Sequence, residues 1–262
     1  MNRFWPILPL ESHAAGLCHT GPVTSDATSF GQAVDHYDRA RPGYPSDAVE
    51  LVLTHQPRQV VDVGAGTGKL TAALLGAGRE VVAVDPDEAM LARLQQRLPG
   101  VRTLVGTGES VPLPDANADL VTFGQSWHWV DVPAASAEVA RVLRPGGVLG
   151  LVWNVRDTSQ PWVAELGEIM GASNAERLIE ADAVRLEGPF GPLAEHVVTW
   201  QYPLDGERLV ALAASRSYVI TAAPQRREEI LTQVRELAAR VADPDGQISM
   251  PYRTHTFQAV RD

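Results

Sequence analysis

Short apolar runs alternate with longer amphipathic stretches through the middle of the chain. Runs rich in β-branched residues predict buried strands, and apolar positions at helical spacing predict helices. The expected strands are residues 59–63, 80–84, 101–105, 118–123 and 148–153, and the expected helices are residues 69–77, 87–98 and 133–143. Strands and helices in alternation predict βαβ units, so we expect a parallel sheet covered on both faces.

The pattern is less regular beyond Asn154. Here we expect helices at residues 162–170, 175–186, 207–218 and 226–241, and strands at residues 195–201 and 248–260. The last helix carries one apolar stripe, typical of core packing, which consists of Ile230, Val234, Leu237 and Val241. No repeat or long linker divides the chain, so we expect one domain over residues 28–262 behind a loosely ordered leader at residues 1–27.

Composition and charge exclude several classes of function. The chain has 22 Lys and Arg against 32 Asp and Glu, a net charge of -10, and such a chain repels a polyanion such as nucleic acid. The single cysteine, Cys18, allows neither an internal disulfide nor a multi-thiolate zinc site, and it fits the reducing cytoplasm. We therefore predict no metal site and no nucleic-acid partner.

The N-terminus contains an apolar stretch at Phe4–Leu10. Prolines interrupt it, and Leu17 is too large to precede the cysteine of a lipoprotein cleavage site. No later run approaches the ~20 apolar residues that span a bilayer. We expect a cytoplasmic protein with no membrane partner.

The most informative segment is residues 60–68, where a strand runs into a glycine-rich turn and then a helix. Gly64, Gly66 and Gly68 let the backbone approach a ligand closely, beside the unpaired N–H groups of a helix start. A phosphate-binding P-loop needs G-x-x-x-x-G-K-[ST], which the chain does not match at two positions. A dinucleotide fingerprint needs a third glycine where Lys69 stands, which weakens this alternative without removing it.

Asp85 lies 21 residues after Gly64, at the end of the second expected strand. A carboxylate there can accept both hydroxyls of a ribose bound over the sheet edge, whichever nucleoside cofactor is used. The structural alternative is that Asp85 caps the helix that starts near Asp87.

Four short motifs follow one another along the chain, at residues 62–68, 84–86, 106–114 and 143–147. Together they resemble the motifs of class I S-adenosylmethionine-dependent methyltransferases of the small-molecule type. Upstream, residues 37–45 resemble a segment of a subgroup that includes trans-aconitate methyltransferase-like proteins. The resemblance implies an α/β, Rossmann-like three-layer fold with a mostly parallel seven-stranded sheet whose last strand is antiparallel.

The resemblance implies S-adenosylmethionine as the cofactor. It divides the domain into N-terminal lid helices at 28–58, a cofactor-binding core at 59–154, and acceptor-side helices with the last two strands at 155–262. The glycine turn would line the methionine moiety, with the ribose on Asp85. Many relatives carry Asp where Thr107 stands. The cofactor-binding residues that the resemblance implies are Tyr37, Arg41, Asp62, Gly64, Ala65, Gly66, Gly68, Asp85, Pro86, Gly108, Glu109 and Gln125.

Methyl transfer from a sulfonium is an in-line displacement, which requires a dry, aligned pocket more than a proton relay. Trp127, His128 and Trp129 follow the fourth expected strand, where the crevice of an α/β sheet opens. We expect the indoles to wall a small-molecule acceptor and His128 to be catalytic, as the base. The alternative is that the tryptophans belong to the core and His128 is structural.

Trp153, Arg216 and Tyr218 complete the expected acceptor-binding residues. Arg216 and Tyr218 belong to a segment that resembles one which relatives fold over the acceptor. An anionic acceptor requires a guanidinium, for which Arg156 and Arg216 are the candidates, although each also fits a surface arginine.

Other functions stay open or are excluded at this point. Residues 125–128 differ from the Asp/Asn-Pro-Pro-Tyr/Phe segment of amino-group DNA methyltransferases, which favours a small-molecule acceptor. One alternative is an NAD-dependent oxidoreductase, and another is a non-catalytic S-adenosylmethionine-binding protein. We expect a monomer or a homodimer.

Overall fold

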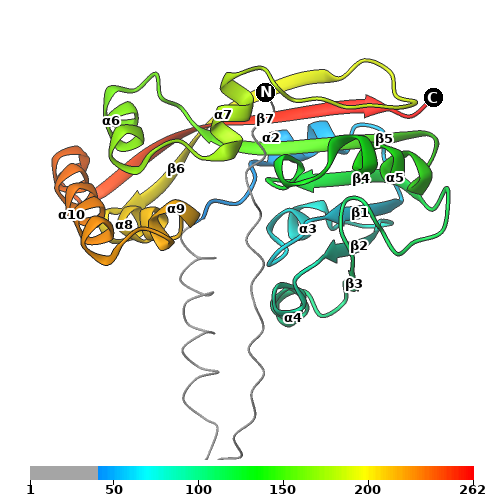
Figure 1. Ribbon diagram of the computed structural model, residues 1–262, viewed down its shortest axis with the longest axis horizontal. Helices are drawn as coiled ribbons and strands as arrows, with labels where there is room; N and C mark the ends of the chain where they lie inside the picture. The colour runs from blue at the N-terminus through cyan, green and yellow to red at the C-terminus, as the bar shows by residue number, and fades with distance from the viewer. Residues whose placement is uncertain (1–40) are drawn as a thin grey trace, which may run out of the picture. The chain divides into compact units, whose positions relative to one another are not determined.

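The computed structural model describes residues 41–262 and shows one seven-stranded sheet (Figure 1). Its strand order is β3-β2-β1-β4-β5-β7-β6. The strands are β1 (Gln59–Val63), β2 (Glu80–Asp85), β3 (Arg102–Val105), β4 (Ala118–Gly124), β5 (Leu143–Arg156), β6 (Ala194–Asp205) and β7 (Gln247–Val260). Strands β1 to β5 pair in parallel, whereas β7 runs antiparallel to both β5 and β6. The expected α/β fold, with its last strand antiparallel, is confirmed.

Helices flank this sheet, and several of them pack together against the ends of β6 and β7. They are α2 (Ser46–Val52), α3 (Lys69–Leu74), α4 (Glu88–Arg97), α5 (Val132–Val142), α6 (Pro161–Met170), α7 (Asn174–Glu180), α8 (Gly206–Ala214), α9 (Ser217–Ile220) and α10 (Pro224–Val241), with the short 3-10 helix η1 (Trp127–Trp129) after β4.

Neighbouring residues of the central strands face opposite sides of the sheet, as the pleat requires. Val61 packs in one buried cluster with Val139 of α5. Val60 packs in another with Val49 of α2 and Leu70 of α3. Because both faces are covered, most positions of these strands are apolar, which is why the sequence predicts them well.

A further buried cluster joins α6, α8 and α10 to the ends of β6 and β7 (Figure 1). The expected stripe of α10 belongs to it, since Ile230, Val234 and Leu237 are buried and Val241 packs against them. This cluster fixes α8, which ends next to Arg216.

Several elements end where the sequence pattern does not indicate it. Helix α7 stops at Glu180 instead of residue 186, and Asp182 has a φ of 46°. Val184 is buried nevertheless, so the apolar residues expected in a helix pack from a loop. The helix expected at 207–218 breaks after Ala214 and restarts as α9.

No helix within residues 41–262 is long and apolar enough to span a lipid bilayer. The expected leader at 1–27, Cys18 and Tyr37 lie outside the described residues.

Candidate functional site

A cavity of about 790 Å³ opens at the carboxyl ends of the parallel strands. Backbone and side chains from distant parts of the chain line it: Arg41 and Tyr44 before α2, Asp62 in β1 and Gly64 to Thr67 after it, Asp85 at the end of β2, Gly124, Gln125, His128 and Trp129 from the end of β4 to η1, Asn154 in β5, Gly171 to Ala175 and Arg177 around the start of α7, and Leu212, Arg216 and Tyr252. This is the edge at which α/β sheets bind ligands.

The glycine turn between β1 and α3 forms one wall. Gly64, Gly66 and Gly68 have φ values of 68°, 54° and 84°, a region that side-chain-bearing residues avoid. A Cβ at Gly64 would lie 2.5 Å from the Ser126 Cβ, and one at Gly68 would lie 2.7 Å from the Leu94 Cγ. A Cβ at Gly66 would meet nothing within 4 Å, so this backbone faces open space where a ligand fits closely.

Asp62 stands at the base of this turn and is fully buried. Its carboxylate accepts hydrogen bonds from the Thr71 and Thr122 hydroxyls at 2.6 and 3.0 Å. Burial raises the pKa of Asp62 to about 6, against the opposing effect of these two bonds. Asp62 therefore ties β1 to β4 and α3 beneath the cavity.

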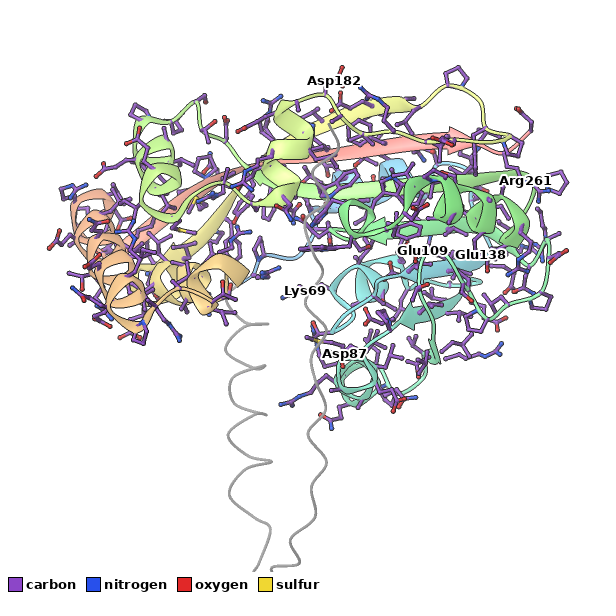
Figure 2. All side chains as sticks on the ribbon, in the orientation of Figure 1. Lys69, Asp87, Glu109, Glu138, Asp182 and Arg261 are labelled. Atoms are coloured by element: carbon purple, nitrogen blue, oxygen red, sulfur yellow. The ribbon has the colours of Figure 1, made fainter. Side chains whose placement is uncertain are left out.

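Asp85 brings its carboxylate to the cavity wall at the end of β2. Its Oδ2 accepts from the Gly66 N–H at 2.8 Å, and its Oδ1 accepts from the Asp87 N–H at 2.9 Å. Each oxygen keeps a further lone pair for a ligand hydroxyl. Asp87, labelled in Figure 2, itself caps α4 by accepting from the Ala89 and Met90 N–H groups, so Asp85 is not the helix cap.

Gln125 follows β4 with a φ of 59°, which is uncommon for a residue other than glycine. Its backbone N–H donates to the Val152 carbonyl at 2.8 Å, and its Nε2 donates to the Asn154 carbonyl at 2.9 Å. Both bonds hold it to β5 at the cavity wall. Strained backbone that is fixed in this way is typical of functional sites.

His128 lies in η1 and lines the cavity. The Trp153 indole N–H, which can only donate, points to the His128 Nδ1 at 3.3 Å. The neutral ring therefore carries its proton on Nε2. Burial lowers the pKa of His128 to about 4, so at neutral pH it offers an N–H donor.

The three expected tryptophans separate into two environments. Trp127 is 2% exposed and packs edge-on against Phe123, and its Nε1 donates to the Arg185 carbonyl at 3.1 Å. Trp153 is fully buried. Of the three, Trp129 alone lines the cavity, and it is 68% exposed.

Two buried polar groups of the cavity lining have no hydrogen-bond partner among the described residues. The Nε of Arg216 and the Oη of Tyr252 are buried and make no hydrogen bond to any described residue. Tyr252 is 2% exposed, and both side chains line the cavity. Unpaired buried donors are costly, which points to a ligand that pairs them.

The second candidate guanidinium, Arg156, is committed elsewhere. It donates from Nε and Nη2 to the two carboxylate oxygens of Glu176 at 2.6 and 3.0 Å, and both residues are buried. Burial alone would raise the pKa of Glu176, but the bonds from Arg156 outweigh it and hold that pKa at about 2.

Some expected residues do not line the cavity. Pro86 is exposed, and Gly108 packs beneath Val130. Glu109, labelled in Figure 2, accepts from the Asp131 N–H at 2.8 Å. The Tyr218 side chain, like Tyr37, is outside the described part of the structure. Binding roles for these residues stay predictions.

Other residues line the cavity without having been predicted. Met90 shares the apolar face of α4, where its spacing indicates core packing. Tyr252 and the first turn of α7 belong to no motif, so only the fold brings them to the cavity, whereas Tyr44 lies in the segment 37–45 that resembles one of a methyltransferase subgroup. Within residues 41–262, no cluster of three or more His, Cys, Asp or Glu side chains is arranged to hold a metal ion.

The burial of His128 predicts a pH effect on stability. The unfolded chain binds a proton near pH 6.5 and the folded protein only near pH 4, so the free energy of unfolding falls as the pH drops through this interval. If His128 were fully buried, the free energy of unfolding would fall by about 3 kcal/mol over this interval. Because His128 is partly exposed, we expect a fall of about 1–2 kcal/mol. The raised pKa of Asp62 has the opposite effect, because it increases the free energy of unfolding as the pH drops through the same interval. Denaturant unfolding is therefore measured at pH 7 and pH 4.5 for both the native chain and His128→Gln, and the loss of stability in the variant is subtracted from that in the native chain. Equal losses in both chains would contradict the burial of His128.

Known proteins resemble this chain in sequence. Residues 61–151 match the family model described as a methyltransferase domain. An uncharacterized methyltransferase of Mycobacterium tuberculosis is 48% identical over 235 residues, which cover 88% of this chain and 95% of that protein. The malonyl-[acyl-carrier protein] O-methyltransferase of Serratia marcescens is 31% identical over 216 residues, which cover 80% of this chain and 71% of that protein.

A solved structure resembles the fold as well. A presumed type II methyltransferase from Anaeromyxobacter dehalogenans superposes with a TM-score of 0.63 at 22% identity, and the match covers 84% of this chain and 97% of that chain. At this identity the likeness concerns the fold alone.

Proposed function

Because this chain belongs to the S-adenosylmethionine-dependent methyltransferase family, we propose that it transfers a methyl group to a carboxylate oxygen of a small organic acceptor. It is an enzyme that uses S-adenosylmethionine, which supplies an electrophilic methyl group on a sulfonium. The interpretation of the glycine turn as an NAD site is accordingly set aside. The trans-aconitate-like subgroup stays a prediction.

The residues at the glycine end of the cavity fit the cofactor. The open face of Gly66 gives room for close backbone contact, and the Asp85 carboxylate beside it has lone pairs for ribose hydroxyls. Gln125, fixed between β4 and β5, stands between this end and the acceptor end. We propose that these residues, with Gly64, bind the cofactor.

The observation that carries the carboxylate proposal is the set of donors at the other end. Arg216 and Tyr252 present unpaired buried donor groups, and His128 presents an Nε2–H. The carboxylates of the cavity wall, Asp62, Asp85 and Asp87, already accept two hydrogen bonds each. A carboxylate acceptor pairs with such donors, and it is ionised at neutral pH, so it needs no base.

The transfer balances without a proton relay. A lone pair of the acceptor oxygen forms the O–CH₃ bond while the C–S bond breaks, and its electron pair neutralises the sulfonium. The products are a methyl ester and S-adenosylhomocysteine. We propose that His128 positions the acceptor by donating a hydrogen bond, in place of the role as a base that the sequence suggests.

The Serratia relative supports an oxygen acceptor, because it is named as an O-methyltransferase that acts on a malonyl group. That name concerns the relative, and the acceptor of this chain is proposed from the donor set described above.

Arg216→Gln tests the acceptor site. We expect kcat/KM for carboxylate acceptors to fall about 10- to 100-fold, because a charge-assisted bond worth ~1.5–3 kcal/mol is lost. The affinity for S-adenosylhomocysteine should stay within about twofold, since Arg216 lies at the other end. The measurement follows labelled methyl groups from S-adenosylmethionine into product.

Arg235→Gln is the matched control, because this arginine lies on the exposed side of α10 and pairs with Glu228. Undiminished turnover of carboxylates by Arg216→Gln, or an equal loss in the control, would exclude Arg216 as the acceptor ligand.

A further inference from the structure

A second hollow of about 360 Å³ lies between η1, the start of α5 and α7 with the loop that follows it. Apolar side chains form most of its wall, namely Trp127, Val130, Val132, Leu178, Ala183 and Val184. Val130, Val132 and Leu178 are only partly buried and pack against the core from this side. The hollow therefore offers apolar surface that the folded chain leaves partly uncovered.

This hollow adjoins the reaction cavity. His128, Asn174 and Arg177 line both spaces, so the two spaces adjoin at these side chains. Asn174 and Arg177 belong to α7, whose position depends on the buried pair of Arg156 with Glu176. A molecule bound at the acceptor end has an apolar region next to it, on the far side of His128.

We propose that the acceptor is an amphipathic carboxylate, whose apolar chain occupies this hollow while its carboxylate meets Arg216 and Tyr252. The inference rests on the proposed function, because the proposed function assigns the carboxylate of the same acceptor and the inference adds its apolar chain. The lining that the hollow shares with the reaction cavity selects this occupant over a separate ligand or a protein partner.

The apolar wall predicts a dependence on chain length. Burial of one CH₂ group contributes ~0.8 kcal/mol, so each added methylene should tighten binding about fourfold until the hollow is filled. Beyond that length the affinity should level off.

The experiment is calorimetric binding of straight-chain carboxylates from four to twelve carbons to the full chain saturated with S-adenosylhomocysteine. Binding is read without turnover, so a failure of the chain-length prediction is distinguishable from a failure of methyl transfer, which is assayed separately with S-adenosylmethionine. Affinity that rises with length and then levels off supports the proposal. Affinity that is independent of length, or no binding by any member, overturns it.

Ala183→Trp tests the location, because this half-buried loop residue lines the hollow and the indole would fill it. We expect the length dependence to disappear, while the shortest carboxylate binds within about twofold of its native affinity. Ala181→Trp is the matched control, since Ala181 is exposed at the end of α7 and lines neither cavity. An unchanged length dependence in Ala183→Trp, or its equal loss in the control, would place the chain elsewhere.

Discussion

Asp85→Asn is expected to raise the dissociation constant of S-adenosylhomocysteine about 10- to 150-fold. The native carboxylate lines the cavity and accepts from the Gly66 and Asp87 N–H groups, which leaves each oxygen a further lone pair for a ligand. Asparagine keeps one acceptor oxygen but loses the charge, and hydrogen bonds to a charged group contribute ~1.5–3 kcal/mol. Isothermal calorimetry with S-adenosylhomocysteine measures the change.

Asp87→Asn is the control, because Asp87 also lines the cavity but serves α4 as its N-cap. Asparagine caps helices about as well as aspartate, so we expect less than about threefold change. Native affinity in Asp85→Asn, with thermal unfolding unchanged, would mean that the ribose binds elsewhere.

The second large effect concerns stability. Glu176→Ala should lower the free energy of unfolding by about 3–5 kcal/mol, because it leaves the Arg156 guanidinium buried without its counter-charge. Glu176 also closes the capping box of α7, accepting from the Ser173 N–H at 2.7 Å. Denaturant unfolding at pH 7 measures the loss.

Two further variants separate charge from packing. Glu180→Ala, exposed on the same helix, should change the unfolding free energy by less than about 0.5 kcal/mol. Arg156→Met combined with Glu176→Leu should be more stable than Glu176→Ala alone, because no unpaired charge remains. A double variant as unstable as the single one would show that the buried ion pair is not the cause.

The sheet could be predicted because its strands are marked locally. Val60 and Val61 lie on opposite faces and both are buried, so the apolar run itself indicates a covered parallel strand. Helix ends were harder to predict, because Val184 and Leu186 are apolar like helix residues but pack from a loop.

The two halves of the site differ in the same way. Gly64, Gly66 and Asp85 belong to recognisable motifs, so the sequence could predict that they line one crevice. The proposed acceptor end combines Arg216 after α8 with Tyr252 in β7, and only long-range packing joins them.

The tryptophans show a different limit of the sequence. Residue type does not tell which way a ring points, so the sequence does not reveal that Trp127 and Trp153 are buried beside the reaction cavity, nor that Trp127 borders the second hollow instead. The same packing changes the interpretation of His128, because the Trp153 N–H occupies the nitrogen that a base would use.

The most direct test of carboxylate methylation is a competition in one assay between carboxylates and alcohols of the same chain lengths. Purified protein receives S-adenosylmethionine with a labelled methyl group, and the labelled product is then treated with mild alkali. We predict label in the carboxylate products alone, released by alkali as methanol, because a methyl ester hydrolyses and an ether does not. Label that resists alkali, transfer to the alcohols, or no transfer to any carboxylate would contradict the proposed function.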